Sequence, residues 1–182
     1  ILCDSKGQIW VGHVSGLSVY DNNTDTFKNF ISSNGPVTHI AELYPEHYLT
    51  IVGKRLMIFD QEDEKFTKEN LPSDLTSLMA TALYIYKDSI FIGTEDGQCF
   101  CTDRLMKNVR RISADIPDSQ INCMLQAGDD HIWIGTEDAG LWDISLDENY
   151  SCRKVNDMHG SKSTTIIKSL NIDNEGNLWI GS

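Results

Sequence analysis

Short apolar runs of four to seven residues recur along the whole chain and are separated by polar turn residues. A strand with one wet face alternates apolar and polar residues, whereas a continuous apolar run bounded by turns is typical of a strand buried on both faces. No stretch carries apolar residues at the i, i+3, i+4, i+7 spacing over three turns, so the pattern predicts essentially no helix. The chain is therefore predicted to be all-β, with sheets that are covered on both sides.

One of these apolar runs is repeated five times and always ends in glycine. The copies are Ile9–Gly12, Thr50–Gly53, Ile90–Gly93, Ile132–Gly135 and Leu178–Gly181. Their glycines lie 41, 40, 42 and 46 residues apart, a period that is typical of the four-stranded blades of a β-propeller. The sequence predicts a propeller segment of about four and a half antiparallel blades. The expected repeats span approximately 1–36, 37–77, 78–120, 121–165 and a truncated 166–182.

The number of repeats bears on the expected shape and partners of the segment. A seven-bladed ring needs about 290 residues at this period, whereas the chain has 182, so an open arc is expected rather than a closed ring. The chain looks like a segment of something longer, whose remaining blades would be its first partners. The end blades would expose apolar faces that neighbours normally cover, and this favours self-association, including a homodimer.

Composition narrows the class of partner. Lys and Arg total 15 against 27 Asp and Glu, a net charge of −12, which disfavours binding to nucleic acid and to anionic membrane surfaces. No apolar run is long enough to span a membrane. Sugars, cations and other proteins remain open as ligands.

The five cysteines do not form the pattern of a disulfide framework, because their number is odd and no C-x-x-C pair occurs. Small buried hydrophobic residues are the simpler interpretation, which taken alone favours a reducing compartment. They are Cys3, Cys99, Cys101, Cys123 and Cys152.

In a blade of up-and-down strands, the loop between the second and third strands opens on the same face as the linker to the next blade. The residues of these loops differ between repeats while the framework does not, as expected where loops on a rigid scaffold bind a ligand. The ligand-binding candidates from these loops are His13, Ser15, Lys54, Arg55, Thr94, Glu95, Asp96, Thr136, Glu137 and Asp138.

Each candidate also has a purely structural interpretation. The Thr-Glu-Asp segments contain residues that tight turns favour for backbone reasons, so hairpin chemistry competes with ligand contact. Lys54 and Arg55 are the only adjacent basic pair on this face and are the best candidates for an anionic group such as a uronic acid carboxylate. Trp10, Trp133 and Trp179 are in register with aliphatic or aromatic residues in the other repeats, which favours packing between blades over stacking on sugars.

Motifs for metal binding and catalysis are missing from the sequence. The five histidines have no metal-ligand spacing, and the Asp-x-x-Gly turns at Asp4 and Asp173 lack the ligand series of a calcium loop. No nucleophile elbow, P-loop or dinucleotide fingerprint occurs. We therefore expect no metal, no cofactor and no catalytic residues, and predict that this segment is not an enzyme.

Four stretches carry a family resemblance. Residues 4–12 and 173–181 read Asp-x-x-Gly-x-(Ile/Leu)-Trp-(Val/Ile)-Gly, residues 132–141 read Ile-Trp-Ile-Gly-Thr-x-x-x-Gly-Leu, and residues 16–21 read Gly-Leu-x-x-Tyr-Asp. Together they resemble the two-component regulator propeller repeat, strongly in repeats one, four and five and weakly in the other two.

The resemblance implies a function that the residues alone do not give. Such repeats are typical of the extracytoplasmic sensor regions of hybrid two-component histidine kinases in polysaccharide-degrading gut bacteria. By this resemblance the chain is expected to be a periplasmic segment that recognises a glycan-derived oligosaccharide and signals to a kinase outside it. A propeller scaffold for protein–protein interaction is the alternative, and a propeller lyase or hydrolase is the least supported third.

Overall fold

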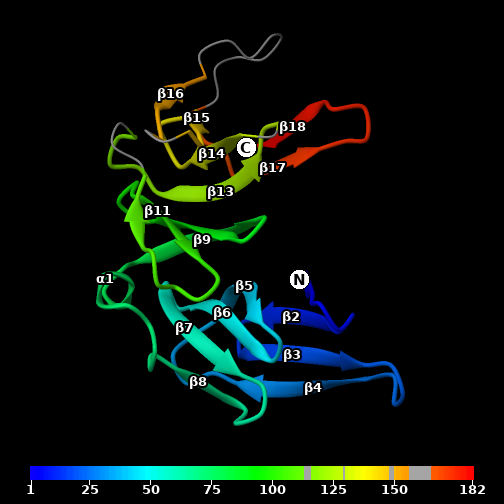
Figure 1. The fold of residues 1–182 in the computed structure, drawn as a ribbon. Coiled ribbons are helices and arrows are strands. Elements are labelled where there is room, and N and C mark those ends of the chain that lie inside the picture. Colours follow the sequence, from blue (N-terminus) through cyan, green and yellow to red (C-terminus); the bar gives the residue numbers. More distant parts are fainter. Residues whose placement is uncertain (113–115, 129, 148–149, 156–164) are drawn as a thin grey trace. The chain divides into compact units, whose positions relative to one another are not determined.

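The computed structural model describes residues 1–112, 116–128, 130–147, 150–155 and 165–182. The chain is all-β, as the sequence predicts, with four antiparallel sheets of four strands and one sheet of two (Figure 1). In the described part of the chain the only helix is the single turn α1 (Ser73–Thr76), so the prediction of essentially no helix holds. None of the described helices is long and apolar enough to cross a membrane.

Each sheet is built from strands that are consecutive in the chain, in the order expected for a propeller blade. The first sheet contains β1 (Leu2–Cys3), β2 (Ile9–His13), β3 (Gly16–Asp21) and β4 (Thr26–Ile31). The second contains β5 (Val37–Tyr44), β6 (His47–Val52), β7 (Arg55–Asp60) and β8 (Lys65–Thr67).

The remaining sheets follow the same rule. The third contains β9 (Ala80–Tyr86), β10 (Ser89–Thr94), β11 (Cys99–Asp103) and β12 (Arg110–Arg111), and the fourth contains β13 (Ile121–Gln126), β14 (His131–Thr136), β15 (Leu141–Ser145) and β16 (Cys152–Lys154). The fifth is the hairpin of β17 (Ser169–Ile172) and β18 (Leu178–Gly181). The polar loop expected at 156–163 lies outside the described residues.

The chain divides into two compact units. The N-terminal unit comprises Ile1–Ala80 with Asp103–Lys107, and the C-terminal unit comprises Thr81–Thr102 with Asn108–Ser182. The N-terminal unit therefore holds the first two sheets, and the C-terminal unit holds nearly all of the other three.

The core of the N-terminal unit lies between its two sheets. Trp10 from β2 is fully buried, and its ring centroid lies 4.6 Å from that of Tyr48 and 5.8 Å from that of Phe59 in the second sheet. Phe30 lies 4.9 Å from Phe59 and completes the cluster. The expected packing of Trp10 between blades is confirmed, whereas Trp133 is half-buried and Trp179 is exposed.

The repeated glycine has a packing role that its position at the strand end did not reveal. A Cβ atom on Gly93 would lie 2.5 Å from Cγ2 of Ile121, the first residue of the next sheet. On Gly135 it would lie 2.5 Å from Cγ2 of Ile167, and on Gly12 it would lie 2.5 Å from the carbonyl oxygen of Val37. The glycine therefore leaves the space into which the following blade inserts its first apolar residue.

The cysteines only partly follow the expectation of buried hydrophobic residues. Cys99 and Cys101 are buried in the core of the C-terminal unit, Cys123 and Cys152 are half-buried, and Cys3 is exposed. All five are free thiols. Burial raises the pKa of the Cys123 thiol to about 11, which leaves it protonated and unreactive at neutral pH.

Candidate ligand-binding sites

The loops between second and third strands meet the linkers between blades, as expected for one face of a propeller. In the C-terminal unit, the amide of Glu137 donates to the carbonyl of Gln120, and the amide of Asp138 donates to Oγ of Ser119. In the N-terminal unit, Gly53 lies against Asn34 and Gly35 of the preceding linker. We call the surface formed by these loops and linkers the loop face.

Two of the ten candidate residues, Thr94 and Thr136, end strands β10 and β14 and have buried side chains. Thr94 and Thr136 are 1% and 0% exposed. The hydroxyl of Thr136 donates to the carbonyl of Gly140 at 2.8 Å and accepts from the amide of Ala139 at 3.1 Å. Thr94 closes the corresponding turn by accepting the backbone amide of Gln98 on its hydroxyl oxygen at 2.9 Å. Both threonines satisfy backbone groups of their own hairpins and are not available to a ligand.

Asp96 also belongs to turn chemistry. Its carboxylate accepts the Thr94 hydroxyl at 2.5 Å and the Gln98 side-chain amide at 2.6 Å. The hydrogen bond from Thr94 lowers the pKa of Asp96 more than burial raises it, and the Gln98 amide lowers it further. Glu95, beside it, is exposed.

Glu137 is the candidate that the structure places in a polar cluster. Its Oε2 accepts from the Asn122 side-chain amide at 2.8 Å and from the Lys168 ammonium group. The Lys168 hydrogen bond, followed by that of Asn122, holds the pKa of Glu137 below its usual value, so the carboxylate is charged at neutral pH. Gln120 donates to the Asn122 side-chain oxygen at 2.8 Å. We call Gln120, Asn122, Glu137 and Lys168 the loop-face cluster.

Sequence reasoning missed three members of this cluster, although the repeats contain a signal for two. Asn122 and Lys168 each follow the buried first residue of a blade, as Thr81 does in the third repeat. The Asn122 amide donates to the carbonyl of Ile167, and the Thr81 hydroxyl donates to that of Ile121. A polar residue after the buried apolar one is thus a repeated feature of the innermost strands.

The remaining candidates lie in the N-terminal unit. The imidazole of His13 accepts the Ser15 amide on Nδ1 at 3.2 Å and contacts the Ser18 hydroxyl through Nε2 at 2.9 Å. Because Nδ1 accepts a hydrogen bond from a backbone amide, the proton of the neutral ring lies on Nε2. Arg55 donates to the carbonyl of Ser77 at 3.2 Å, and Lys54 has a φ of 67° in the β6–β7 turn. Asp138 makes its described contact through its amide.

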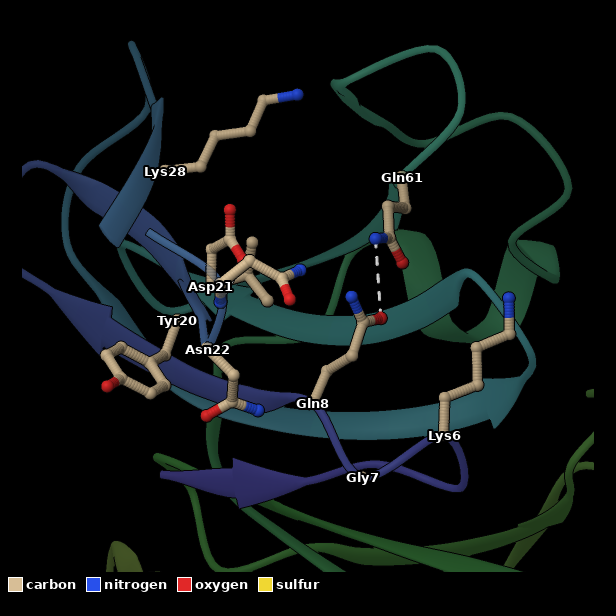
Figure 2. Close-up of a pocket in the computed structure, with 10 residues that line it drawn as sticks. Lys6, Gly7, Gln8, Tyr20, Asp21, Asn22, Lys28 and Gln61 are labelled. Atoms are coloured by element: carbon tan, nitrogen blue, oxygen red, sulfur yellow. Dashed lines mark hydrogen bonds between the residues drawn. The ribbon is translucent and has the colours of Figure 1, made fainter. Parts of the chain in front are cut away.

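A hollow of about 350 Å³ lies among the other set of turns in the N-terminal unit (Figure 2). The turn between β1 and β2, the turn between β3 and β4, and the end of β7 supply its walls. It is lined by Lys6, Gly7, Gln8, Val19, Tyr20, Asp21, Asn22, Asn23, Lys28 and Gln61. None of these residues is among the candidates predicted from the sequence, which all come from the loops between second and third strands. We call this hollow the turn-face hollow.

A buried carboxylate supports the floor of the turn-face hollow. Asp4 accepts hydrogen bonds from Trp10 Nε1 at 2.9 Å and from the Tyr48 hydroxyl at 2.7 Å, and from the amides of Lys6 and Gln8. Burial alone would raise the pKa of Asp4, but these hydrogen bonds together lower it. Burial of Tyr48, followed by its hydrogen bond to the Asp4 carboxylate, raises the pKa of Tyr48.

No group of three or more His, Cys, Asp or Glu side chains that would hold a metal ion occurs among the described residues. The two surfaces instead offer amides, hydroxyls, carboxylates and ammonium groups in solvent-accessible positions. Such groups recognise polar ligands by hydrogen bonding and by charge.

The fold and its repeats place the chain in the class of β-propeller segments. Residues 115–138 match the family model described as two component regulator propeller, which confirms the resemblance found in the repeats. No curated protein matches the chain.

Solved structures with the same fold include two domains from B. thetaiotaomicron. The extracellular domain of BT4673, assigned to a hybrid two component system, is 17% identical in sequence, with a TM-score of 0.77. The match covers 99% of this chain and 24% of that domain. The extracellular domain of BT3049, assigned likewise, is 20% identical with a TM-score of 0.73, and 100% of this chain covers 25% of it. The WD40 β-propeller domain of Doa1 is 18% identical with a TM-score of 0.70 over 97% of this chain and 57% of that one. The chain thus spans about a quarter of the length of these two extracellular domains.

Proposed function

We propose that this chain is a ligand-sensing segment of the extracytoplasmic region of a two-component sensor, and that its ligand is a glycan-derived oligosaccharide. The family match at residues 115–138 and the likeness to two extracellular domains of hybrid two component systems support the sensor role. An extracytoplasmic location, periplasmic in a bacterium with two membranes, goes with that role.

The observation that carries the ligand-binding part is the loop-face cluster. Four hydrogen-bonding side chains from two neighbouring blades converge there, and Asn122 also donates to the carbonyl of Ile167 in the next blade. Their exposure is substantial, since the side chains of Glu137 and Lys168 are 42% and 52% exposed. Amides beside an ion pair supply both donors and acceptors, which is what the hydroxyl groups of a sugar require.

Calorimetry of the full chain against neutral and unsaturated acidic oligosaccharides tests this function. We expect one class of fragment to bind, and we expect Lys168→Ala to weaken its binding by about tenfold because one charged hydrogen bond is lost. Lys154→Ala, on the exposed outer strand β16, is the matched control and should bind like the wild type. If no oligosaccharide binds the full chain, the sensing proposal fails.

The alternative is a propeller scaffold that docks a protein partner without binding a small ligand. The exposed aromatic side chain of Trp179 on the fifth sheet favours this alternative, because exposed apolar sheet surface is typical of contact sites. A pull-down with the full chain that recovers a partner equally well with and without oligosaccharide would favour the scaffold. Turnover of any fragment would instead favour an enzyme.

A further inference from the structure

The turn-face hollow is formed by two blades, and its position separates it from the loop face. Lys6, Gly7 and Gln8 come from the turn before β2, Tyr20 and Asp21 end β3, Asn22 follows in the β3–β4 turn, and Gln61 follows β7 (Figure 2). Its volume of about 350 Å³ is at the lower end of the range of about 300–1,000 Å³ that is typical of small-molecule sites. The space suits a single ring rather than a long chain.

The charges around the hollow argue against an anionic ligand. Lys6 is paired with Glu46 at 2.7 Å, and Lys28 is paired with Glu64 at 2.5 Å. Asp21 adds a further carboxylate to the lining. Two ammonium groups are therefore balanced by two glutamates, and one aspartate remains in excess. An incoming anion would have to compete with both glutamates.

The groups left for recognition are side-chain amides. Gln8 and Gln61 point toward each other across the hollow and share a single hydrogen bond of 3.4 Å (Figure 2). This length is beyond the usual range for N–H···O bonds, so a ligand hydroxyl would replace the contact at little cost. Within the described chain, the Asn22 side chain makes no hydrogen bond. Each amide offers a donor and an acceptor, which matches the dual character of a hydroxyl group.

The hollow is held in shape before any ligand arrives. The Tyr48 hydroxyl donates its proton to the buried Asp4 at 2.7 Å, and the Gln61 side-chain oxygen lies 3.3 Å from this anchored hydroxyl. The Tyr20 hydroxyl donates to the Asp25 carboxylate at 2.6 Å, and the centroids of the Tyr20 and Phe27 rings lie 5.3 Å apart. These two contacts fix the Tyr20 side chain. A preformed wall of this kind lowers the ordering cost of binding, and the aromatic ring offers apolar surface beside the amides.

We propose that the turn-face hollow binds one neutral, hydroxyl-rich ring, in chemical terms a neutral sugar unit, through Gln8, Asn22 and Gln61. This site is distinct from the loop-face cluster and does not depend on the sensor role of the chain. A single ring held by a few amides is expected to bind weakly, with a dissociation constant on the order of 1 mM.

The test is a titration of the ¹⁵N-labelled full chain with D-glucose, D-galactose and N-acetyl-D-glucosamine, monitored by NMR. At least one of the three should shift the side-chain amide signals of Gln8, Asn22 and Gln61 saturably. D-glucuronate should bind at least about tenfold more weakly than the best neutral sugar, because the glutamates already occupy the lysines. Saturation by none of the three neutral sugars, or tighter binding of glucuronate, overturns the proposal.

Variants separate this site from folding and from the loop face. Asn22→Ala removes an amide that makes no hydrogen bond within the described chain, so it should leave the fold intact and weaken binding at least about threefold. Gln126→Ala removes an amide at the end of β13 and should bind normally. Lys168→Ala should leave binding unchanged, so failure of the loop-face proposal and failure of this one are distinguishable. Unaltered binding by Asn22→Ala contradicts the assignment.

Discussion

Asp4 and Asp173 occupy the same position in two repeats and accept the same hydrogen bonds. The indole that bonds Asp4 is buried, whereas the indole that bonds Asp173 is exposed. Each carboxylate accepts the indole N–H six residues later, Trp10 at 2.9 Å and Trp179 at 2.8 Å, and also accepts two backbone amides of its turn. The Asp and Trp of the family motif are therefore a single hydrogen-bonded unit that sets the hairpin geometry. The Asp–Trp pair of the motif therefore indicates a role in the blade framework rather than in ligand binding.

Replacing Asp4 should destabilise the N-terminal unit strongly. In Asp4→Ala, Trp10 Nε1 and the Tyr48 hydroxyl lose their shared acceptor in a buried site, where each unsatisfied group costs about 1–3 kcal/mol. We expect a loss of about 3 kcal/mol in the free energy of unfolding, measured by urea titration with tryptophan fluorescence. Asp173→Ala makes the same change at an exposed motif and should cost much less. Equal losses in the two variants would contradict the importance of burial.

The glycine before each new blade should not tolerate a side chain. In Gly93→Ala the added Cβ would lie 2.5 Å from Cγ2 and 2.8 Å from Cβ of Ile121, so the next blade must shift. Overpacking of this kind costs about 1–3 kcal/mol, measured as a drop in unfolding free energy. The double variant with Ile121→Ala should lose less than the sum of the two single changes, because the clash is relieved. Simple additivity would contradict the contact.

At the scale of elements, the β17–β18 hairpin depends on an ionised Asp173. Hydrogen bonds from Trp179, then from Asn177 and Glu175, lower the pKa of Asp173 from its ordinary value of 3.8 to about 2. Because the folded hairpin binds fewer protons than the unfolded chain, this contribution to stability is fully present above about pH 4 and is lost as the pH falls toward about 2.

The emission of Trp179 should therefore change between pH 4 and pH 2, as its indole N–H loses the carboxylate acceptor. A variant with Trp10, Trp133 and Trp142 replaced by phenylalanine isolates this signal, and Asp173→Asn in that background is the control. The control has no carboxylate to titrate and should give a flat profile over the same range. A transition of equal size in the control would contradict the assignment to Asp173.

The elements were largely predictable from the sequence, because each blade repeats a short apolar run with turn residues at fixed offsets. The sequence predicts outer strands near Val109–Ile112 and within Leu146–Val155, and β12 and β16 lie inside these segments. Tryptophan burial was not predictable in the same way. Trp10 and Trp179 have the same local sequence and the same aspartate, but only Trp10 has Tyr48 and Phe59 of a following sheet against it.

The candidate sites were less predictable because they combine residues from separate repeats. The composition of the Thr-Glu-Asp turns did not distinguish Thr136, which closes its own hairpin, from Glu137, which contacts Lys168 from the next blade. The turn-face hollow joins Gln8 and Gln61, which are 53 positions apart. Such partners follow from the register between blades, which turn propensity does not encode.

At the scale of the whole molecule, the uncovered apolar sheet surface should govern association. Trp179 is 63% exposed on the fifth sheet, whereas the equivalent Trp10 is 0% exposed beneath the second sheet. Trp10 is buried because aromatic residues of the second sheet pack against it. A second copy can supply such a surface in solution, since Ile9 and Ile31 on the first sheet are also exposed.

The 182-residue chain is therefore expected to show a mass above that of the monomer at micromolar concentration, measured by light scattering after size-exclusion chromatography. Trp179→Lys should shift it toward the monomer, because a charge would be buried without a partner. Leu105→Lys is the matched control, since Leu105 is 62% exposed but lies in a loop rather than on a sheet face. A monomeric wild type would contradict the expected association. An equal effect of the two lysines would show that general hydrophobicity rather than the blade surface decides it.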